Sequence, residues 1–255
     1  MRAFLLPLAL VPMLTACEGN ALNLFTIQDD MDLGAQLRDE ILANPDEYPL
    51  VDAEEYPDAY AHLDRVVTEV LDSGEVDHHD DFAWEFYLID DDVLNAFAAP
   101  GGYIYIYTGL IDFLSHEDEL AGVLGHEIAH AANRHTTEQL TKIYGVSVLL
   151  GVVLGEDQQL ITDIATGLAG LSFSRAHEAE ADDYSVFYLC ETYYAANGAA
   201  GFFEALEEMP IPEFLSTHPS SDGRVEDINA LAAELGCSTA YYPDAEWQAF
   251  LDSLP

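Results

Sequence analysis

The sequence predicts an α+β protein that is mainly helical, with a small β-sheet beside the helix that contains residues 126–130. Nonpolar residues at Leu120, Val123, Leu124, Ile128 and Ala131 follow the period of a helix packed on a core, and further helices are expected before and after this one. Two short segments, 84–89 and 103–108, are rich in aromatic and β-branched residues and indicate strands. One helical stretch contains His-Glu-x-x-His at residues 126–130, a spacing typical of metal sites.

The first residues resemble the export signal of a bacterial lipoprotein. Arg2 is followed by a nonpolar run too short to span a bilayer, and small residues precede Cys17. Leu14-Thr15-Ala16-Cys17 is similar to a lipobox, in which cleavage leaves the cysteine as an acylated first residue. We expect a signal peptide at 1–16, a lipid anchor on Cys17 and a tether at 17–30. A plain secretory signal with an incidental cysteine is the alternative.

The chain after the tether, residues 31–255, is long enough for one well-packed domain but scarcely for two. Helices expected at about 31–43 and 56–71 would cover the core. The two strands are expected to join through Pro100-Gly101-Gly102, because these residues favour a turn. An edge strand of such a sheet can pair with an extended peptide.

The helix that carries the motif can begin at Ser115, with acidic residues in its first turn where the helix dipole favours them. His126 and His130 lie four positions apart on one helix face, so both imidazoles can reach one cation. Glu127 lies beside the open coordination position. A catalytic zinc ion normally takes three protein ligands, so a third is needed. The long zinc signature fails to supply it, because Thr136 stands where it requires histidine.

Residues 144–171 form a nonpolar stretch that Gly155-Glu156-Asp157-Gln158-Gln159 divides in two. Each half is shorter than the roughly 20 residues that a membrane span needs, so a helical pair is expected. This pair can pack in the core. It can also act as a nonpolar lid that grips unfolded proteins or touches a membrane surface.

A second helix is expected to start at Ser174 and to supply the missing ligand. Glu178 and Asp182 share one face at positions i and i+4. Glu178 can complete a site of two histidines and one glutamate, and Asp182 can hydrogen-bond the outer ring nitrogen of a ligating histidine. Glu180 would point away. A solvated acidic face is the alternative interpretation.

Two cysteines remain besides Cys17. Cys190 falls at the end of the second helix, and Cys237 follows another helix expected at about 222–235. Only one pairing is possible, so in an oxidising compartment the two are candidates for a disulfide. Two buried thiols are the alternative.

The charge balance is strongly acidic. There are 48 Asp and Glu residues against 7 Lys and Arg, which gives a net charge of −41. This composition excludes nucleic acid as a partner, because there is no basic surface to neutralise phosphates.

Four motifs follow one another over about residues 85–225. They are residues 95–104, the His-Glu-x-x-His motif with Arg134-His135 after it, Ser174-Arg175 before Glu178-x-x-x-Asp182, and Thr217-His218-Pro219-Ser220 followed by Arg224. In this order they resemble the M48 family of zinc metallopeptidases, which are gluzincins with a zincin-like fold.

The resemblance implies a peptidase domain that holds one Zn²⁺ ion per chain through His126, His130 and Glu178. Glu127 would be the general base, in agreement with its place in the motif. His218 would either donate a hydrogen bond to the reacting carbonyl group or plug the open position of the zinc, and Arg224 would orient its loop.

The resemblance also indicates where a substrate binds and what it is. Asn95, Gly101 and Gly102 would belong to the region that binds the substrate strand. The resemblance is to the periplasmic lipoprotein and outer-membrane quality-control branch, so the expected substrates are misfolded or misassembled envelope proteins. The expected location is the periplasm, at the inner leaflet of the outer membrane through Cys17. Glu18 is not the aspartate that resembles an inner-membrane retention signal.

Two alternatives to an endopeptidase belong to other classes of function. One is a lipid-anchored chaperone or binding module that keeps the zinc without catalysis. It is disfavoured because a structural zinc usually has four protein ligands. The other is a metallohydrolase that acts on something other than protein.

Overall fold

The computed structural model describes residues 25–207, 209, 213–219, 223–243 and 246–255. The expected signal peptide, Cys17 and the first part of the tether lie outside the described residues. Among the described helices, none is both long enough and nonpolar enough to cross a membrane.

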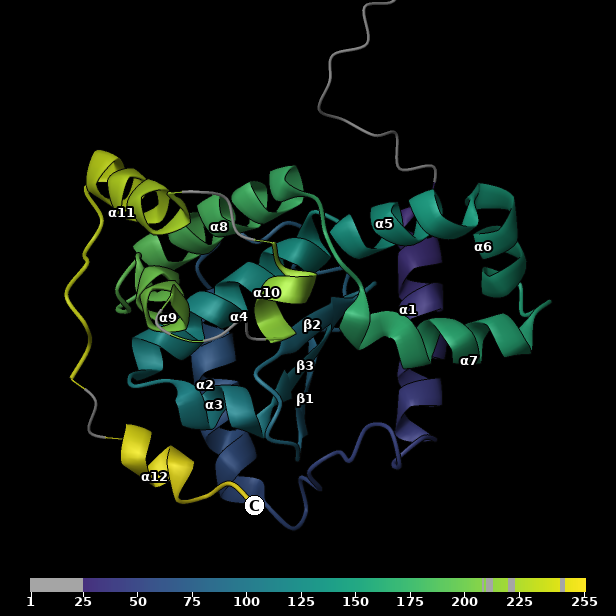
Figure 1. Cartoon of the computed structure of the whole chain (residues 1–255), viewed down its shortest axis with the longest axis horizontal. Coiled ribbons are helices and arrows are strands. Elements are labelled where there is room, and N and C mark those ends of the chain that lie inside the picture. The colour runs from purple at the N-terminus through teal and green to yellow at the C-terminus, as the bar shows by residue number, and fades with distance from the viewer. Residues whose placement is uncertain (1–24, 208, 210–212, 220–222, 244–245) are drawn as a thin grey trace, which may run out of the picture.

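The described chain is mainly helical and contains one small sheet (Figure 1), which confirms the predicted fold class. The elements in order are α1 (Ile27–Leu42), α2 (Pro57–Leu71), β1 (Glu85–Ile89), β2 (Ala96–Ala99), β3 (Tyr103–Tyr107), α3 (Thr108–Phe113), α4 (Glu117–Ala132), α5 (His135–Tyr144), α6 (Val146–Val153), α7 (Gln158–Gly167), the 3₁₀ helix η1 (Leu168–Gly170), α8 (Arg175–Cys190), α9 (Gly198–Glu207), α10 (Glu213–Thr217), α11 (Arg224–Leu235) and α12 (Trp247–Leu251).

The three strands pair in the order β1-β3-β2, so β3 lies in the middle. It runs parallel to β1, with Glu85 opposite Tyr103, and antiparallel to β2. Gly101 and Gly102 form the turn between β2 and β3 with φ of 76° and 88°, a region that favours glycine. The prediction that this turn joins the segment 84–89 to β3 was wrong. Strand β2 was missed because three of its four residues are alanine, which has low strand propensity, and its conformation depends on burial.

Helix α1 begins at Ile27, inside the expected tether, which corrects the boundary placed at residue 30. Thr26 caps the helix. Its hydroxyl accepts the Asp29 N–H at 3.1 Å, and the Asp29 carboxylate accepts the Thr26 N–H at 2.8 Å. Arg134 donates a hydrogen bond to the Asp30 carboxylate, so the start of α1 is tied to the loop that follows α4.

Helix α4 lies at the centre of the main core. All of its residues are buried, and α2, α8, α9 and β2 pack around it (Figure 1). The contact with α9 is close enough to require glycine. A Cβ atom on Gly122 would lie 2.1 Å from the backbone nitrogen of Ala199. The helix that carries the His-Glu-x-x-His motif is therefore held rigidly on several sides.

The nonpolar stretch 144–171 forms the expected helical pair, α6 and α7, which packs against α1 (Figure 1). The buried side of the pair includes Leu149, Val152, Ile161 and Ile164. Other nonpolar side chains of this stretch remain at the surface, with exposed fractions of 44% for Val148 and 73% for Leu154. The pair thus belongs to the core on one side and presents nonpolar surface on the other.

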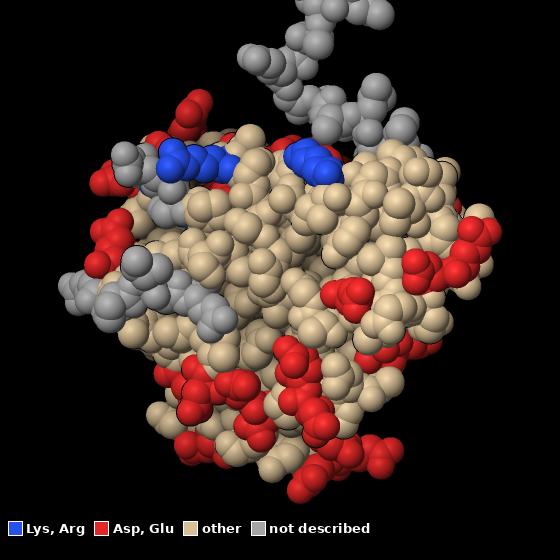
Figure 2. Space-filling model, turned by 45° about the vertical axis from the view of Figure 1, so that its right-hand side comes forward, with Lys and Arg blue, Asp and Glu red and all other residues tan. Residues whose placement is uncertain are grey.

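Acidic side chains are most abundant on the lower half of the face shown in Figure 2, and two separate basic side chains lie near its upper edge. Most of the described cations bind carboxylates of the protein itself. The ion pairs join Arg38 to Glu85, Arg65 to Glu117, Arg134 to Asp30, Lys142 to Glu138 and Arg224 to Asp182. The pair of Lys142 and Glu138 lies within α5, and the other four pairs join different parts of the fold.

Candidate metal centre and active site

Ser115 was predicted to cap α4, but the helix starts one residue later than that prediction implies. The helix begins at Glu117, and His116 is the capping residue. The Glu119 carboxylate accepts the backbone N–H groups of Ser115 and His116, at 2.7 and 3.2 Å, so a side chain inside the helix satisfies them. Beyond the other end, Arg134 adopts a left-handed conformation with φ of 63°, which separates α4 from α5.

Four donor side chains converge in the interior: His126, His130, Glu178 and His218. Their candidate ligand atoms all lie within 4.8 Å of one another. His126 Nε2 lies 3.0 Å from His130 Nε2, and oxygens of Glu178 lie 3.5 and 3.4 Å from these two nitrogens. All four residues are at most 2% exposed. Lone pairs this close repel unless a proton or a cation lies between them, so the cluster can bind a metal ion.

The chemistry of the donors fits zinc. Two histidines and one glutamate form the ligand set of many catalytic zinc sites. The sequence predicted His126, His130 and Glu178 for this purpose, and the structure brings these three side chains together. Helices α4 and α8 supply them and pack along each other.

Asp182 and Arg224 lie behind the cluster. Asp182 Oδ1 is 2.9 Å from His126 Nδ1, and this contact favours the tautomer whose Nε2 lone pair faces the other donors. The Arg224 guanidinium donates to both carboxylate oxygens of Asp182 and, at 3.2 Å, to Glu178. It also lies 3.7 Å above the Phe203 ring. Arg224 therefore orients two carboxylates rather than only the loop before it.

Glu127 is fully buried and, among the described residues, neither of its carboxylate oxygens has a hydrogen-bond partner. His218 Nε2 lies 3.6 Å from Oε1, too far for a good hydrogen bond. Burial raises the pKa of Glu127, while His218 and His126 oppose the rise. A buried carboxylate without a partner is unfavourable in a folded protein, so its presence beside the cluster indicates a function there.

His218 follows α10 and joins the cluster as its fourth side chain. Its Nδ1 lies 3.3 Å from His126 Nε2 and 3.2 Å from Glu178 Oε1. The ring stacks on Phe214 with centroids 4.3 Å apart. Its position is compatible with both predicted roles, since one ring nitrogen lies among the metal-binding atoms and the other faces Glu127.

The predicted substrate-strand residues have different surroundings. Asn95 lies directly before β2, is buried, and donates a hydrogen bond to the Ala169 carbonyl oxygen at 3.1 Å. Gly101 and Gly102 instead pack closely on the start of α1 and on Trp84. Their contacts account for glycine at both positions, and a role in substrate binding stays a prediction.

His135 was not recognised as part of the site from the sequence. Its Nδ1 lies 3.1 Å from His130 Nδ1, and its Nε2 lies 3.4 Å from the Glu180 carboxylate. Burial and the adjacent His177 ring lower the pKa of His135 to about 3. His135 thus orients His130 as Asp182 orients His126. The sequence did contain a signal for this role, because His135 follows His130 by only five residues and starts α5.

The sulfur atoms of Cys190 and Cys237 are bonded in the structure, with their Cα atoms 5.1 Å apart. The bond links the end of α8, which carries Glu178, to the residue that follows the C-terminal cap of α11, which carries Arg224.

A buried His-Glu-x-x-His helix, joined by a glutamate from a neighbouring helix beside a small sheet, defines a metallopeptidase. The chain belongs to peptidase family M48, because the model of that family matches residues 57–232.

Three similar proteins illustrate the range of the family. The chain is 32% identical over 154 residues to the mitochondrial metalloendopeptidase OMA1 of Arabidopsis thaliana, a match that covers 58% of this chain and 31% of that protein. It is 30% identical over 170 residues to the beta-barrel assembly-enhancing protease of Yersinia pestis, covering 60% and 35%. It is 30% identical over 155 residues to the metalloprotease YcaL of Escherichia coli K12, covering 57% and 60%. The chain therefore matches less than two thirds of each relative's length.

Proposed function

We propose that the protein is a zinc-dependent endopeptidase that cleaves misfolded or misassembled proteins of the bacterial cell envelope. One observation carries the chemical part of this proposal. His126, His130 and Glu178 direct donor atoms at one point beside Glu127, whose buried carboxylate has no hydrogen-bond partner among the described residues.

Zinc held by these three side chains would supply Lewis acidity, which makes water nucleophilic near neutral pH and polarises a peptide carbonyl. Glu127 removes the proton of the attacking water and delivers it to the leaving amine. Its burial suits this task, because a raised pKa brings a carboxylate closer to the pH at which it must both take and give a proton.

The neighbouring residues keep the ligands in place. Asp182 holds the His126 ring, and His135 holds the His130 ring. Arg224 offsets one of the two negative charges of Asp182 and Glu178. We assign His218 as a reversible plug, since its Nδ1 lies among the metal-binding atoms. A peptide would then reach the site only after His218 has moved.

The cellular part of the proposal places the enzyme in the periplasm, attached through a lipid on Cys17 to the inner leaflet of the outer membrane. It is supported by the lipobox-like sequence at residues 14–17 and by the bacterial relatives, one of which is named for assembly of β-barrels. The mitochondrial relatives show that similar domains also work in another compartment.

The test compares the native protein with Glu127→Gln. We expect both to bind one zinc ion per chain, measured by elemental analysis, and only the native protein to cleave casein. A general base contributes roughly 10²- to 10⁴-fold, so the variant should lose at least a hundredfold in rate. A chelator should abolish cleavage by the native protein. Undiminished cleavage by Glu127→Gln would show that Glu127 is not the general base. Zinc binding without any cleavage by the native protein would favour the lipid-anchored binding module.

A further inference from the structure

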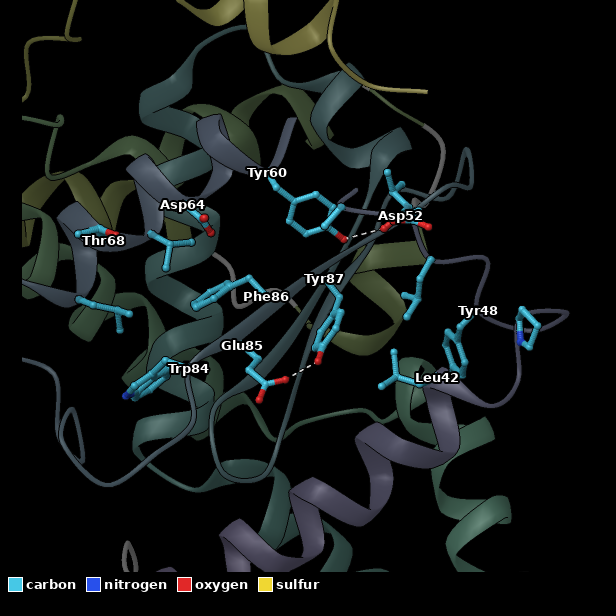
Figure 3. Close-up of a pocket in the computed structure, with 16 residues that line it drawn as sticks. Leu42, Tyr48, Asp52, Tyr60, Asp64, Thr68, Trp84, Glu85, Phe86 and Tyr87 are labelled. Carbon is cyan, nitrogen blue, oxygen red and sulfur yellow. Dashed lines mark hydrogen bonds between the residues drawn. The ribbon is translucent and has the colours of Figure 1, made fainter. Parts of the chain in front are cut away.

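A groove of about 700 Å³ lies along β1, on the other side of the sheet from β2. Figure 3 shows its lining side chains. Tyr60 and Asp64 belong to α2, Phe86 and Tyr87 to β1, Leu42 to the end of α1, and Tyr48 and Asp52 to the segment after α1. None of the four side chains of the cluster lines the groove, so the two sites are separate.

The groove exposes an unpaired part of a strand edge. Among the described strands β1 pairs only with β3, and on its outer edge it forms one isolated antiparallel bridge, between Ile89 and Leu50. Glu85 directs its N–H to the Gly102 carbonyl oxygen. In a parallel pair, alternate residues point their peptide groups to opposite sides, so Phe86 and Leu88 face the outer edge. The Leu88 peptide is satisfied there, by the Tyr60 hydroxyl and the Val51 N–H.

The peptide group of Phe86 has no hydrogen-bond partner among the described residues at that outer edge. A free N–H and C=O on a strand edge favour the addition of another extended chain, because such a chain supplies the matching acceptor and donor. Phe86 itself lines the groove. The bound chain would therefore lie within the groove, antiparallel or parallel to β1.

The side chains of the groove set the preferred residues of such a chain. Tyr60, Trp84 and Phe86 supply aromatic surface, which favours nonpolar side chains. Asp64 is exposed in the same groove and has no ion pair or hydrogen bond in the described part of the structure. The lining contains no Lys or Arg.

Asp64 has no ion pair within the described chain, whereas Glu85, another acidic residue of the groove, has one. Glu85 is neutralised by Arg38 at 3.1 Å and accepts a hydrogen bond from the Tyr87 hydroxyl (Figure 3). Asp64 is thus available to a cation that a bound chain brings, and an ammonium or guanidinium group beside aromatic rings gains cation–π attraction as well.

We propose that the groove between α2 and β1 is a second polypeptide-binding site, which takes an extended segment with nonpolar side chains and one Lys or Arg by adding it to the edge of β1. The site requires no catalysis and does not depend on the proposed function of the metal centre.

The test uses fluorescence anisotropy with the fluorescein-labelled peptide Thr-Val-Lys-Val-Thr and the Glu127→Gln variant, which keeps the peptide intact. Two further peptides carry either Glu in place of Lys or N-methyl groups on the central residues. We expect both changes to weaken binding about three- to tenfold, the first through loss of the ion pair and the second through loss of strand addition. Excess chelator should leave binding unchanged, which separates this site from the metal centre.

Asp64→Asn, introduced into the Glu127→Gln background, should weaken binding of the Lys peptide about three- to tenfold and leave binding of the Glu peptide unweakened. Asp58→Asn in the same background is the matched control, because Asp58 belongs to the same helix, is exposed and does not line this groove. Equal binding of the N-methylated and unmodified peptides would overturn the proposal. So would equal weakening by Asp58→Asn, since attraction to the general negative charge would then explain the binding.

Discussion

The guanidinium group of Arg224 donates to both carboxylate oxygens of Asp182, from Nε at 2.6 Å and from Nη2 at 2.7 Å. Both side chains are buried, and the pair joins α11 to α8 directly behind His126. A bidentate pair fixes the carboxylate plane as well as its charge. The orientation of His126, a candidate metal ligand, therefore depends on a residue 98 positions away along the chain.

Asp182→Asn should weaken zinc binding about 10- to 100-fold, because it removes the carboxylate that holds the His126 ring. Competition with a zinc-binding dye measures the affinity. Asp183→Asn is the control, since Asp183 is the next residue of α8 and is exposed. An unchanged zinc affinity of Asp182→Asn would show that packing alone orients His126.

His218→Ala should raise the rate of peptide cleavage severalfold, because His218 Nδ1 lies among the atoms that would bind zinc. The measurement is the initial rate on a fluorogenic peptide at equal zinc content. His79→Ala, at an exposed position, should have no effect. A fall in kcat for His218→Ala would instead assign this residue to stabilisation of the reacting carbonyl oxygen.

Gly122→Ala should lower the free energy of unfolding by about 1–3 kcal/mol or more, because its methyl group would meet the α9 backbone. Gly167→Ala makes the same chemical change at the end of α7, where an added Cβ would meet nothing within 4 Å. This second variant should be neutral or more stable by about 0.5–1 kcal/mol. Denaturant unfolding compares them, and equal effects would contradict the close contact of α4 with α9.

Glu117 should make stability depend on pH in the acidic range. Burial raises the pKa of its carboxyl group, but hydrogen bonds from Arg65 at 2.5 Å and Tyr194 at 2.6 Å outweigh burial, so the pKa lies below its ordinary value of 4.5. A depressed folded-state pKa means that the contribution is fully present above pH 4.5 and is lost as the pH falls through the lower value.

Glu117→Gln should therefore be less stable than the native protein at pH 7, by about 1–3 kcal/mol, and the difference should shrink below pH 4. Urea unfolding from pH 3 to 7 measures it. Glu69→Gln on α2, whose carboxyl group forms no ion pair in the described structure, is the control. A difference that stays constant with pH would exclude linkage to this carboxyl group.

Local signals were enough to predict the elements that carry the site. The periodic nonpolar residues around His126 and the capping residue Ser174 are signals that lie within a few helical turns. The structure has α4 around His126 and starts α8 directly after Ser174, as these signals predict. The four-residue spacing likewise placed Glu178 and Asp182 on one face before their partners were known.

The features that the sequence reading missed depend on tertiary contacts. Strand β2 is an alanine-rich segment whose extended form is stabilised by pairing with β3 and by burial on both faces. His135 reaches His130 only because Arg134 turns the chain with a left-handed conformation. Neither the burial of an alanine nor the direction of such a turn can be obtained from periodicity.

Helix α11 is attached to α8 near both ends of α11. The ion pair of Arg224 with Asp182 holds its first residue, and the disulfide of Cys237 with Cys190 holds the residue after its C-terminal cap. A helix attached twice cannot swing away as a gate. Any opening of the cluster would then fall to other segments, such as the one that carries His218, which follows α10 and has its ring 5.6 Å from that of Phe173. The covalent bond thus limits which elements can move beside the candidate metal centre, although the bond itself lies outside it.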